Sequence, residues 1–235
     1  MNGKKFYSGM ISIYILTIAL MIGFAYWATT AITVLSENSP VDHRKVIVID
    51  AGHGGIDGGA TSCNGILESQ TNLQIALRLR DVCNLLGLKT IMIRTEDISV
   101  YTSGNTIAAK KVSDLKERVR IANKYSGSTL ISIHQNYFTD SKYRGAQVFY
   151  SPNENSRQLA NIMQEALVHN LNPDSTRTSK AANGIYLMQN IHGTGLLIEC
   201  GFISNHEENI LLQDKSYQQK LSIVIASTLS LHLNA

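Results

Sequence analysis

Two histidines and two glutamates occupy positions at which ionisable side chains can meet in an α/β protein. His53 follows the apolar run 46–49 through a glycine-rich turn, and His134 and Glu199 each directly follow a similar run. Because the carboxyl ends of parallel strands meet at one edge of a sheet, we expect these three side chains to converge there. Glu68 begins the next predicted helix, where the positive end of the helix dipole favours a carboxylate.

This combination of side chains suits a catalytic metal ion. Two imidazoles and one carboxylate can supply the three protein ligands of a catalytic zinc site, and the fourth position is left for water. A second carboxylate beside that water can act as a general base. The metal lowers the pKa of the water towards about 7 and polarises a carbonyl group. The residue types therefore predict metal-assisted hydrolysis.

Each of these residues also has an ordinary structural explanation. His53 could be a surface hydrogen-bonding residue, His134 a satisfied histidine at a strand end, and Glu68 an acid in the first turn of a helix. Glu199 is harder to explain in this way. It lies between Leu-Leu-Ile and Cys-Gly-Phe, where a carboxylate is unfavourable unless it is paired or bound to a metal. The occurrence of all four together favours a functional site.

Predicted strands and helices alternate along the body of the chain. Continuous aliphatic runs are typical of strands that are covered on both faces, and helical spacing of apolar residues marks the segments between them. This alternation predicts a single three-layer α/β domain with a mostly parallel, twisted sheet flanked by helices. The predicted strands are 46–49, 89–94, 129–134, 147–150, 184–188 and 195–199. The predicted helices are 67–86, 113–124 with Ser113 as its cap, 156–171, a short helix begun by an Asn205–Glu208 capping box, and 216–233.

The chain is predicted to have a hydrophobic N-terminal segment (1–36), a polar linker (37–44) and a catalytic domain (45–235). Lys4 and Lys5 precede an uncharged stretch whose apolar centre is longer than that of a typical signal peptide and can cross a membrane as a helix. Lysines on its near side favour a cytoplasmic N-terminus. We therefore expect an exported domain, anchored by an uncleaved helix or secreted if the segment is removed.

The bulk composition argues against a nucleic-acid partner. The 235 residues have a formal net charge of +3, and their basic residues form no stripe with interleaved aromatic residues. The part of the chain after the hydrophobic segment is long enough to form one domain with its own core.

Short motifs follow one another in order from the glycine-rich turn to the last predicted strand. They are Val48-Ile49-Asp50-Ala51-Gly52-His53-Gly54-Gly55 with Asp57, Gly59 and Ala60; Glu68 with Asn72-Leu73; Arg94-Thr95 with Asp97; Leu115 with Arg118 and Ala122-Asn123; Ser132-Ile133-His134 with Asn136; and Glu199 with Gly201-Phe202-Ile203-Ser204-Asn205. In this order and spacing, residues 45–233 resemble the zinc-dependent N-acetylmuramoyl-L-alanine amidases of the type-3 amidase family.

The resemblance implies a role for each candidate site residue. It makes His53, Glu68 and His134 the ligands of Zn²⁺. It makes Glu199 the catalytic carboxylate and Asn136 a substrate-binding residue. The implied substrate is peptidoglycan, cut between the lactyl group of N-acetylmuramic acid and the L-alanine of the stem peptide.

The architecture resembles the sporulation and germination branch of this family, which prepares spore cortex peptidoglycan for muramic-δ-lactam formation. This places the domain on the outer face of a bacterial membrane, with the forespore and mother-cell membranes as candidates. A catalytic domain without a wall-binding module also suggests a helper protein for localisation or activation. Two alternatives stay open: a catalytically silent wall-binding or regulatory protein with the same fold, and another zinc hydrolase such as a peptidase or deacetylase.

Overall fold

The computed structural model describes residues 16–27 and 46–234. Residues 16–27 form a helix. Within the described residues, no helix has both the length and the apolar character needed to cross a membrane. The predicted linker 37–44 and the rest of the predicted N-terminal segment lie outside the described residues.

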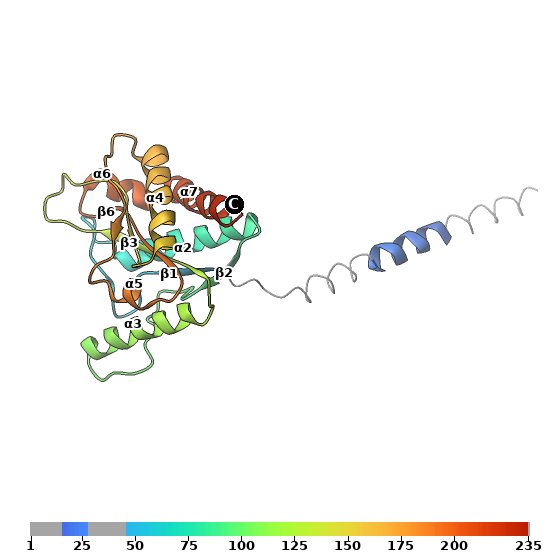
Figure 1. Ribbon diagram of the computed structural model, residues 1–235, viewed down its shortest axis with the longest axis horizontal. Coiled ribbons are helices and arrows are strands. Elements are labelled where there is room, and N and C mark those ends of the chain that lie inside the picture. The colour runs from blue at the N-terminus through green and yellow to red at the C-terminus, as the bar shows by residue number, and fades with distance from the viewer. Residues whose placement is uncertain (1–15, 28–45, 235) are drawn as a thin grey trace, which may run out of the picture. The chain divides into compact units, whose positions relative to one another are not determined.

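A six-stranded sheet forms the centre of the domain (Figure 1). Its strands are β1 (Val46–Ala51), β2 (Lys89–Met92), β3 (Thr129–Asn136), β4 (Gln147–Tyr150), β5 (Lys180–Ala181) and β6 (Thr194–Phe202). They lie in the order β2-β1-β3-β6-β4-β5. β1 runs parallel to β2 and β3, β3 runs parallel to β6, and β4 runs antiparallel to β6. The predicted mostly parallel sheet is confirmed.

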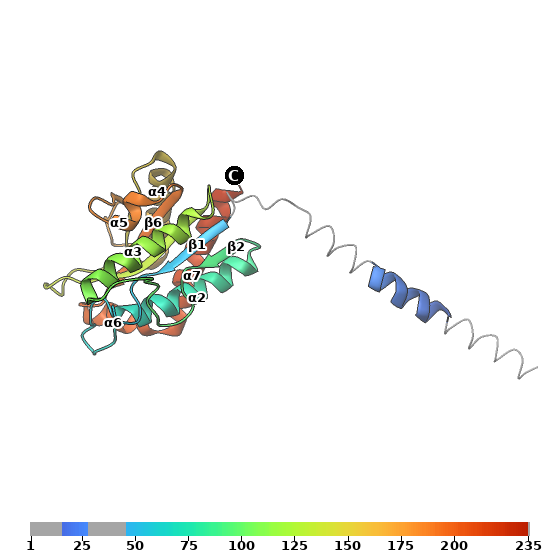
Figure 2. The ribbon, with the colours of Figure 1, turned by 90° about the horizontal axis from the view of Figure 1, so that it is seen from below.

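Six helices accompany this sheet in the described part of the domain. They are α2 (Glu68–Leu85), α3 (Ile107–Asn123), α4 (Glu154–Leu171), α5 (Tyr186–Asn190), α6 (His206–Gln213) and α7 (Lys215–Leu233). Figure 2 shows α2 and α7 side by side, in agreement with their extensive packing contacts. Asn205 caps α6 by accepting a hydrogen bond from the backbone N–H of Glu208, so that predicted helix start is confirmed.

Side chains of β1 alternate between two hydrophobic cores. Ile47 and Ile49 lie in a core with residues of α2, α4 and α7, whereas Val48 lies in a second core with residues of α3 and α5. All three side chains are fully buried. The strand is therefore covered on both faces, which explains its continuous apolar run and confirms the three-layer arrangement.

The strand predicted at residues 184–188 is wrong. Gly184 has a φ of +80° and lies in a turn, and α5 begins two residues later. Leu187 and Met188 are buried in the second core as part of a helical turn. A short apolar run fits a buried strand or a buried helical turn equally well, and packing against α3 decides between them here.

The predicted cap at Ser113 is also wrong. The helix begins earlier, at Ile107, because Thr106 Oγ1 accepts a hydrogen bond from a backbone N–H of the first turn. Ser113 lies inside α3 and is buried. Its Oγ accepts hydrogen bonds from the backbone N–H groups of Thr102 and Ser103, both at 3.1 Å. The serine therefore fastens the preceding loop to the helix.

A buried ion pair joins α3 to the end of β1. Arg118 is 2% exposed and donates hydrogen bonds to Asp50 Oδ1 and to the carbonyl oxygens of Ala51 and His53 at 2.9 and 2.7 Å. Ser132 Oγ donates to Asp50 Oδ2 at 2.6 Å. Burial alone would raise the pKa of Asp50, but the charge of Arg118 and the Ser132 hydrogen bond hold it below the usual value. The network therefore holds the backbone at Ala51 and His53 in place.

Removal of the Arg118 guanidinium would leave Asp50 as an unpaired charge in the interior. We expect Arg118→Met to lower the free energy of unfolding by about 3–5 kcal/mol, measured by urea denaturation. Arg120→Met is the matched control, because Arg120 is exposed and pairs with Glu117 at the surface. The control should leave the unfolding midpoint unchanged, and equally small effects of the two substitutions would contradict the structural role of Arg118.

Candidate metal centre

His53 lies in a tight turn directly after β1. It is the single non-glycine residue with a positive φ among the described residues, at 60°, and Gly54 and Gly55 follow with φ values of 134° and 57°. The backbone N–H groups of Gly54 and Asp57 close the turn by donating to each other's carbonyl oxygens, at 2.8 and 3.1 Å. This conformation is unfavourable for a residue with a Cβ, so the surrounding contacts must maintain it. These contacts also keep the His53 imidazole facing α2.

Glu68, at the first position of α2, lies between two imidazole rings. Its Oε1 is 3.0 Å from His134 Nδ1, and its Oε2 is 3.3 Å from His53 Nε2. The centroids of the two rings are 5.0 Å apart, and the ring planes meet at an angle of 75°. One ligand atom from each of the three residues lies within 4.8 Å of the others. The structure therefore brings His53, Glu68 and His134 together at a spacing that fits one metal ion.

The Glu68 carboxylate is buried and extensively hydrogen-bonded. Oε2 accepts from the backbone N–H of Ala60 at 3.0 Å, and Oε1 accepts from the backbone N–H of Gln135 at 3.1 Å and from Asn72 Nδ2 at 3.2 Å. Burial alone would raise the pKa of Glu68, but the hydrogen bonds and charges of His134 and His53 hold it far below the usual value. The carboxylate is therefore ionised at neutral pH.

Asp57 supports His53 from the opposite side of its ring. The carboxylate Oδ2 lies 2.9 Å from His53 Nδ1, which directs Nε2 towards Glu68. Burial alone would lower the pKa of His53, but Glu68 and Asp57 together raise it to about 9. Two carboxylates thus favour a positive charge at this ring. A metal cation at Nε2 would satisfy the same preference, with Asp57 orienting the ligand.

Glu199 reaches the site from β6, where it lies opposite His134 in the register of the sheet. Its Oε2 is shielded from solvent and has no hydrogen-bond partner among the described residues. Burial raises the pKa of Glu199 to about 7, and the neighbouring charge of Glu68 adds to the increase. A buried carboxylate oxygen without a partner is unfavourable. A bound water or substrate group would provide the missing partner.

Asn136 lies two residues beyond His134, at the end of β3. Its carbonyl oxygen accepts a hydrogen bond from the backbone N–H of Ile203 at 2.9 Å. Among the described residues, no hydrogen bond joins its side chain to the three clustered residues, and it does not line the adjoining pocket. Its role in substrate binding stays a prediction.

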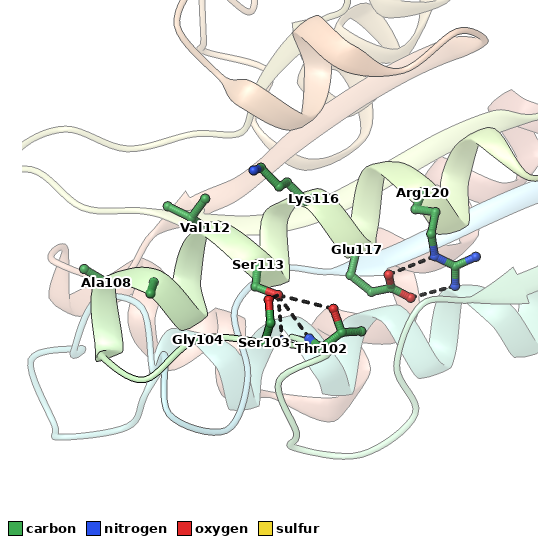
Figure 3. Close-up of a pocket in the computed structure, with 10 residues that line it drawn as sticks. Thr102, Ser103, Gly104, Ala108, Val112, Ser113, Lys116, Glu117 and Arg120 are labelled. Carbon is green, nitrogen blue, oxygen red and sulfur yellow. Dashed lines mark hydrogen bonds and ion pairs between the residues drawn. The ribbon is translucent and has the colours of Figure 1, made fainter.

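A pocket of about 320 Å³ opens beside the metal cluster, and its lining includes His53 and His134. A larger groove of about 540 Å³ runs along α3 and the loop at residues 102–104 (Figure 3). The groove contains none of the predicted site residues. The smaller pocket is therefore the one at which the chemistry would take place, and we refer to it as the site pocket.

Two polar residues beside the cluster are not identified as site residues by the sequence pattern. Asp57 contacts His53, and Lys111 Nζ lies 2.8 Å from Asp57 Oδ1. The sequence signals for Asp57 are its position four residues after His53 in the same glycine-rich turn and its place in the motif that begins at Val48. Lys111 lies far away in the sequence, and only the packing of α3 brings it to the site pocket.

Comparisons with known proteins agree with one another. Residues 47–230 match the family described as N-acetylmuramoyl-L-alanine amidase. The germination-specific N-acetylmuramoyl-L-alanine amidase of Bacillus subtilis (strain 168) is 39% identical over 180 residues, which are 76% of this chain and 75% of that protein.

Solved structures show the same similarity. The CwlD amidase from Clostridioides difficile, solved in complex with the GerS lipoprotein, is 37% identical with a TM-score of 0.77, and the match covers 80% of this chain and 98% of that one. An N-acetylmuramoyl-L-alanine amidase from Clostridium difficile 630 is 27% identical with a TM-score of 0.68, and the match covers 81% of this chain and 97% of that one.

Gly52 lies directly against the His134 ring, so that a Cβ at this position would overlap the imidazole. We expect Gly52→Ala to displace the ring from Glu68 and to weaken Zn²⁺ binding by about 10–100-fold, measured by titration against a chelating indicator. Gly23→Ala is the control, because a Cβ at Gly23 would meet nothing within 4 Å. Unchanged Zn²⁺ affinity in a folded Gly52→Ala variant would show that the His134 position is not needed for metal binding.

Proposed function

Because the chain belongs to the N-acetylmuramoyl-L-alanine amidase family, we propose that it uses Zn²⁺ to hydrolyse the amide bond between N-acetylmuramic acid and the L-alanine of the peptidoglycan stem peptide. One observation carries the proposal. Ligand atoms of His53, Glu68 and His134 converge within 4.8 Å, and the two histidines line the site pocket. The unpartnered Oε2 of Glu199 comes from the strand beside His134.

The donor set fits zinc. Two imidazole nitrogens and one carboxylate oxygen are ligands that zinc takes in catalytic sites, and such sites keep one position open. His53, Glu68 and His134 would hold the ion, and the hydrogen bond between Asp57 and His53 is the kind of outer contact that orients a histidine ligand. When bound, zinc lowers the pKa of water towards about 7 and polarises a carbonyl oxygen.

Glu199 is the proposed general base. Its carboxylate removes a proton from the water that attacks the amide carbonyl carbon. As the carbon–nitrogen bond breaks, the nitrogen keeps the bonding electrons and receives the proton from Glu199. The products are the lactyl carboxylate and the free amino group of L-alanine. A pKa raised to about 7 by burial suits a carboxyl group that must both accept and donate a proton near neutral pH.

We assign this activity to the maturation of spore cortex peptidoglycan, where release of the stem peptide would precede muramic-δ-lactam formation. The similarity to the germination-specific amidase supports this assignment.

The substrate requires that the catalytic domain is exported. Lys4 and Lys5 before an uncharged apolar stretch support an anchor at residues 1–36, or secretion if that segment is removed.

A helper protein that localises or activates the enzyme is also part of the proposal. The support comes from the similar CwlD amidase, which was solved in complex with the GerS lipoprotein.

Substitution of Glu199 and of His134 should have different effects. Glu199→Gln leaves the three ligands in place, so we expect Zn²⁺ to be retained while turnover falls by about 10²–10⁴-fold. His134→Ala removes a ligand, so we expect Zn²⁺ content to fall together with activity. Metal analysis and release of stem peptide from purified glycan strands measure the two properties. Full activity in Glu199→Gln would rule out the role of Glu199 as general base.

Digestion of purified peptidoglycan with and without a chelator tests metal dependence and bond choice together. Mass spectrometry should show intact stem peptides with a free L-alanine amino group, together with glycan carrying a free lactyl carboxylate. The chelator should stop the reaction, and added Zn²⁺ should restore it. Loss of an acetyl group would indicate a deacetylase, cleavage within the peptide a peptidase, and no product at full zinc occupancy a catalytically silent protein.

A further inference from the structure

One face of α3 lines the site pocket. Lys111, Asp114, Leu115 and Arg118 all contribute to its lining, and their spacing of three, four and seven residues places them on one side of a helix. Lys116, on the same helix, lines the other groove together with Val112, and Figure 3 shows both in that position. The helix therefore presents different side chains to two separate cavities.

Most of the charges on the pocket side of α3 and at the end of β1 neutralise one another. Arg118 is buried and bonds to both Asp50 and Asp114. Asp57 lies between His53 Nδ1 and Lys111 Nζ, at 2.9 and 2.8 Å. Each of these three carboxylates thus has a cationic or hydrogen-bonding partner, and none offers an unpaired negative charge to a ligand.

Lys111 differs from Arg118 because its side chain is 48% exposed. Asp57 is the one ion-pair partner that the described residues provide for it. An ammonium group has three N–H donors, so two stay available after the Asp57 contact is made. Lys111 is thus the exposed cation among the described residues that line the site pocket, and it can bind an anionic group of a ligand held there.

The position of the ammonium limits which anionic group it can reach. Contacts of 2.8 and 2.9 Å through Asp57 link Lys111 to the His53 ring, so the ammonium lies on the order of 10 Å from the metal cluster. An extended peptide advances about 3.3–3.6 Å per residue. A group on the second residue beyond the scissile amide is therefore about 7 Å from the reacting carbonyl, within reach of a lysine side chain at this position.

Peptidoglycan has one suitable anion at that distance. The second residue of the stem peptide is D-glutamate, whose chain continues through the γ-carboxyl and leaves the α-carboxylate free. On the sugar side, the lactyl carboxyl is part of the scissile amide and carries no charge. We propose that Lys111 binds the α-carboxylate of this D-glutamyl residue and thereby selects stem peptides in which it is not amidated. The inference rests on the proposed amidase function.

The test compares two substrates that differ at one group. They are matched muramoyl tetrapeptides with D-glutamate or D-isoglutamine at the second position. We expect the zinc-loaded wild-type protein to have a kcat/KM about tenfold higher for the D-glutamate form, because a charge-assisted hydrogen bond is lost in the amide. In Lys111→Met the ratio of the two kcat/KM values should fall to about one, mainly through a higher KM for the D-glutamate form. Lys111→Arg should keep the preference.

Lys116→Met is the matched control, since it removes the same charge from the other side of the helix and should preserve the ratio. The zinc content of every variant is measured with the kinetics. Equal cleavage of both substrates by the wild type would overturn the inference, and so would a Lys111→Met variant that loses activity on both equally. The second result would mean that the lysine acts through Asp57 on His53 alone. Failure of zinc-loaded wild type to cleave either substrate would instead contradict the proposed function.

Discussion

Glu68 places a negative charge between two imidazoles at the carboxyl edge of the sheet, 3.0 Å from one ring and 3.3 Å from the other. A buried carboxylate is stable only when its lone pairs and its charge are satisfied. Backbone N–H groups of Ala60 and Gln135 satisfy part of this requirement, and they come from the turn after β1 and from β3. The remaining requirement is for positive charge, and the rings of His53 and His134 are positioned to share a cation with the carboxylate. The same contact thus links α2, β1 and β3 and brings the three candidate metal ligands together.

The cluster depends on a turn that would be unfavourable by itself. His53 has a left-handed backbone, and its carbonyl oxygen accepts a hydrogen bond from Arg118. Arg118 is in turn fixed by Asp50, which is the residue that ends the apolar run of β1. Loss of this buried pair would remove both a stabilising charge contact and the support of the candidate metal ligand His53. Stability and function are therefore coupled through α3.

The position of α3 also determines what surrounds the metal centre. This helix brings Arg118 to the base of the site and Lys111 to the rim of the site pocket, seven residues apart on one face. Among the described residues, those that line the larger groove on its other side form no cluster of metal-binding side chains. The clustered ionisable side chains therefore identify the candidate site, and the size of a cavity by itself does not.

Local sequence determined the three central parallel strands, β1, β3 and β6, and the ionisable residues that follow them or lie near their ends. Continuous apolar runs before His53, His134 and Glu199 were enough to predict buried parallel strands with polar ends, because burial on both faces and strand direction impose those patterns. Residues 184–188 show where this reasoning fails, since the same apolar composition fits a strand or a helical turn until its packing partners are known. The contact of Asp57 with Lys111 was decided by tertiary structure alone. It joins a glycine-rich turn to a helix far along the chain, and no local preference specifies which face of that helix meets the turn.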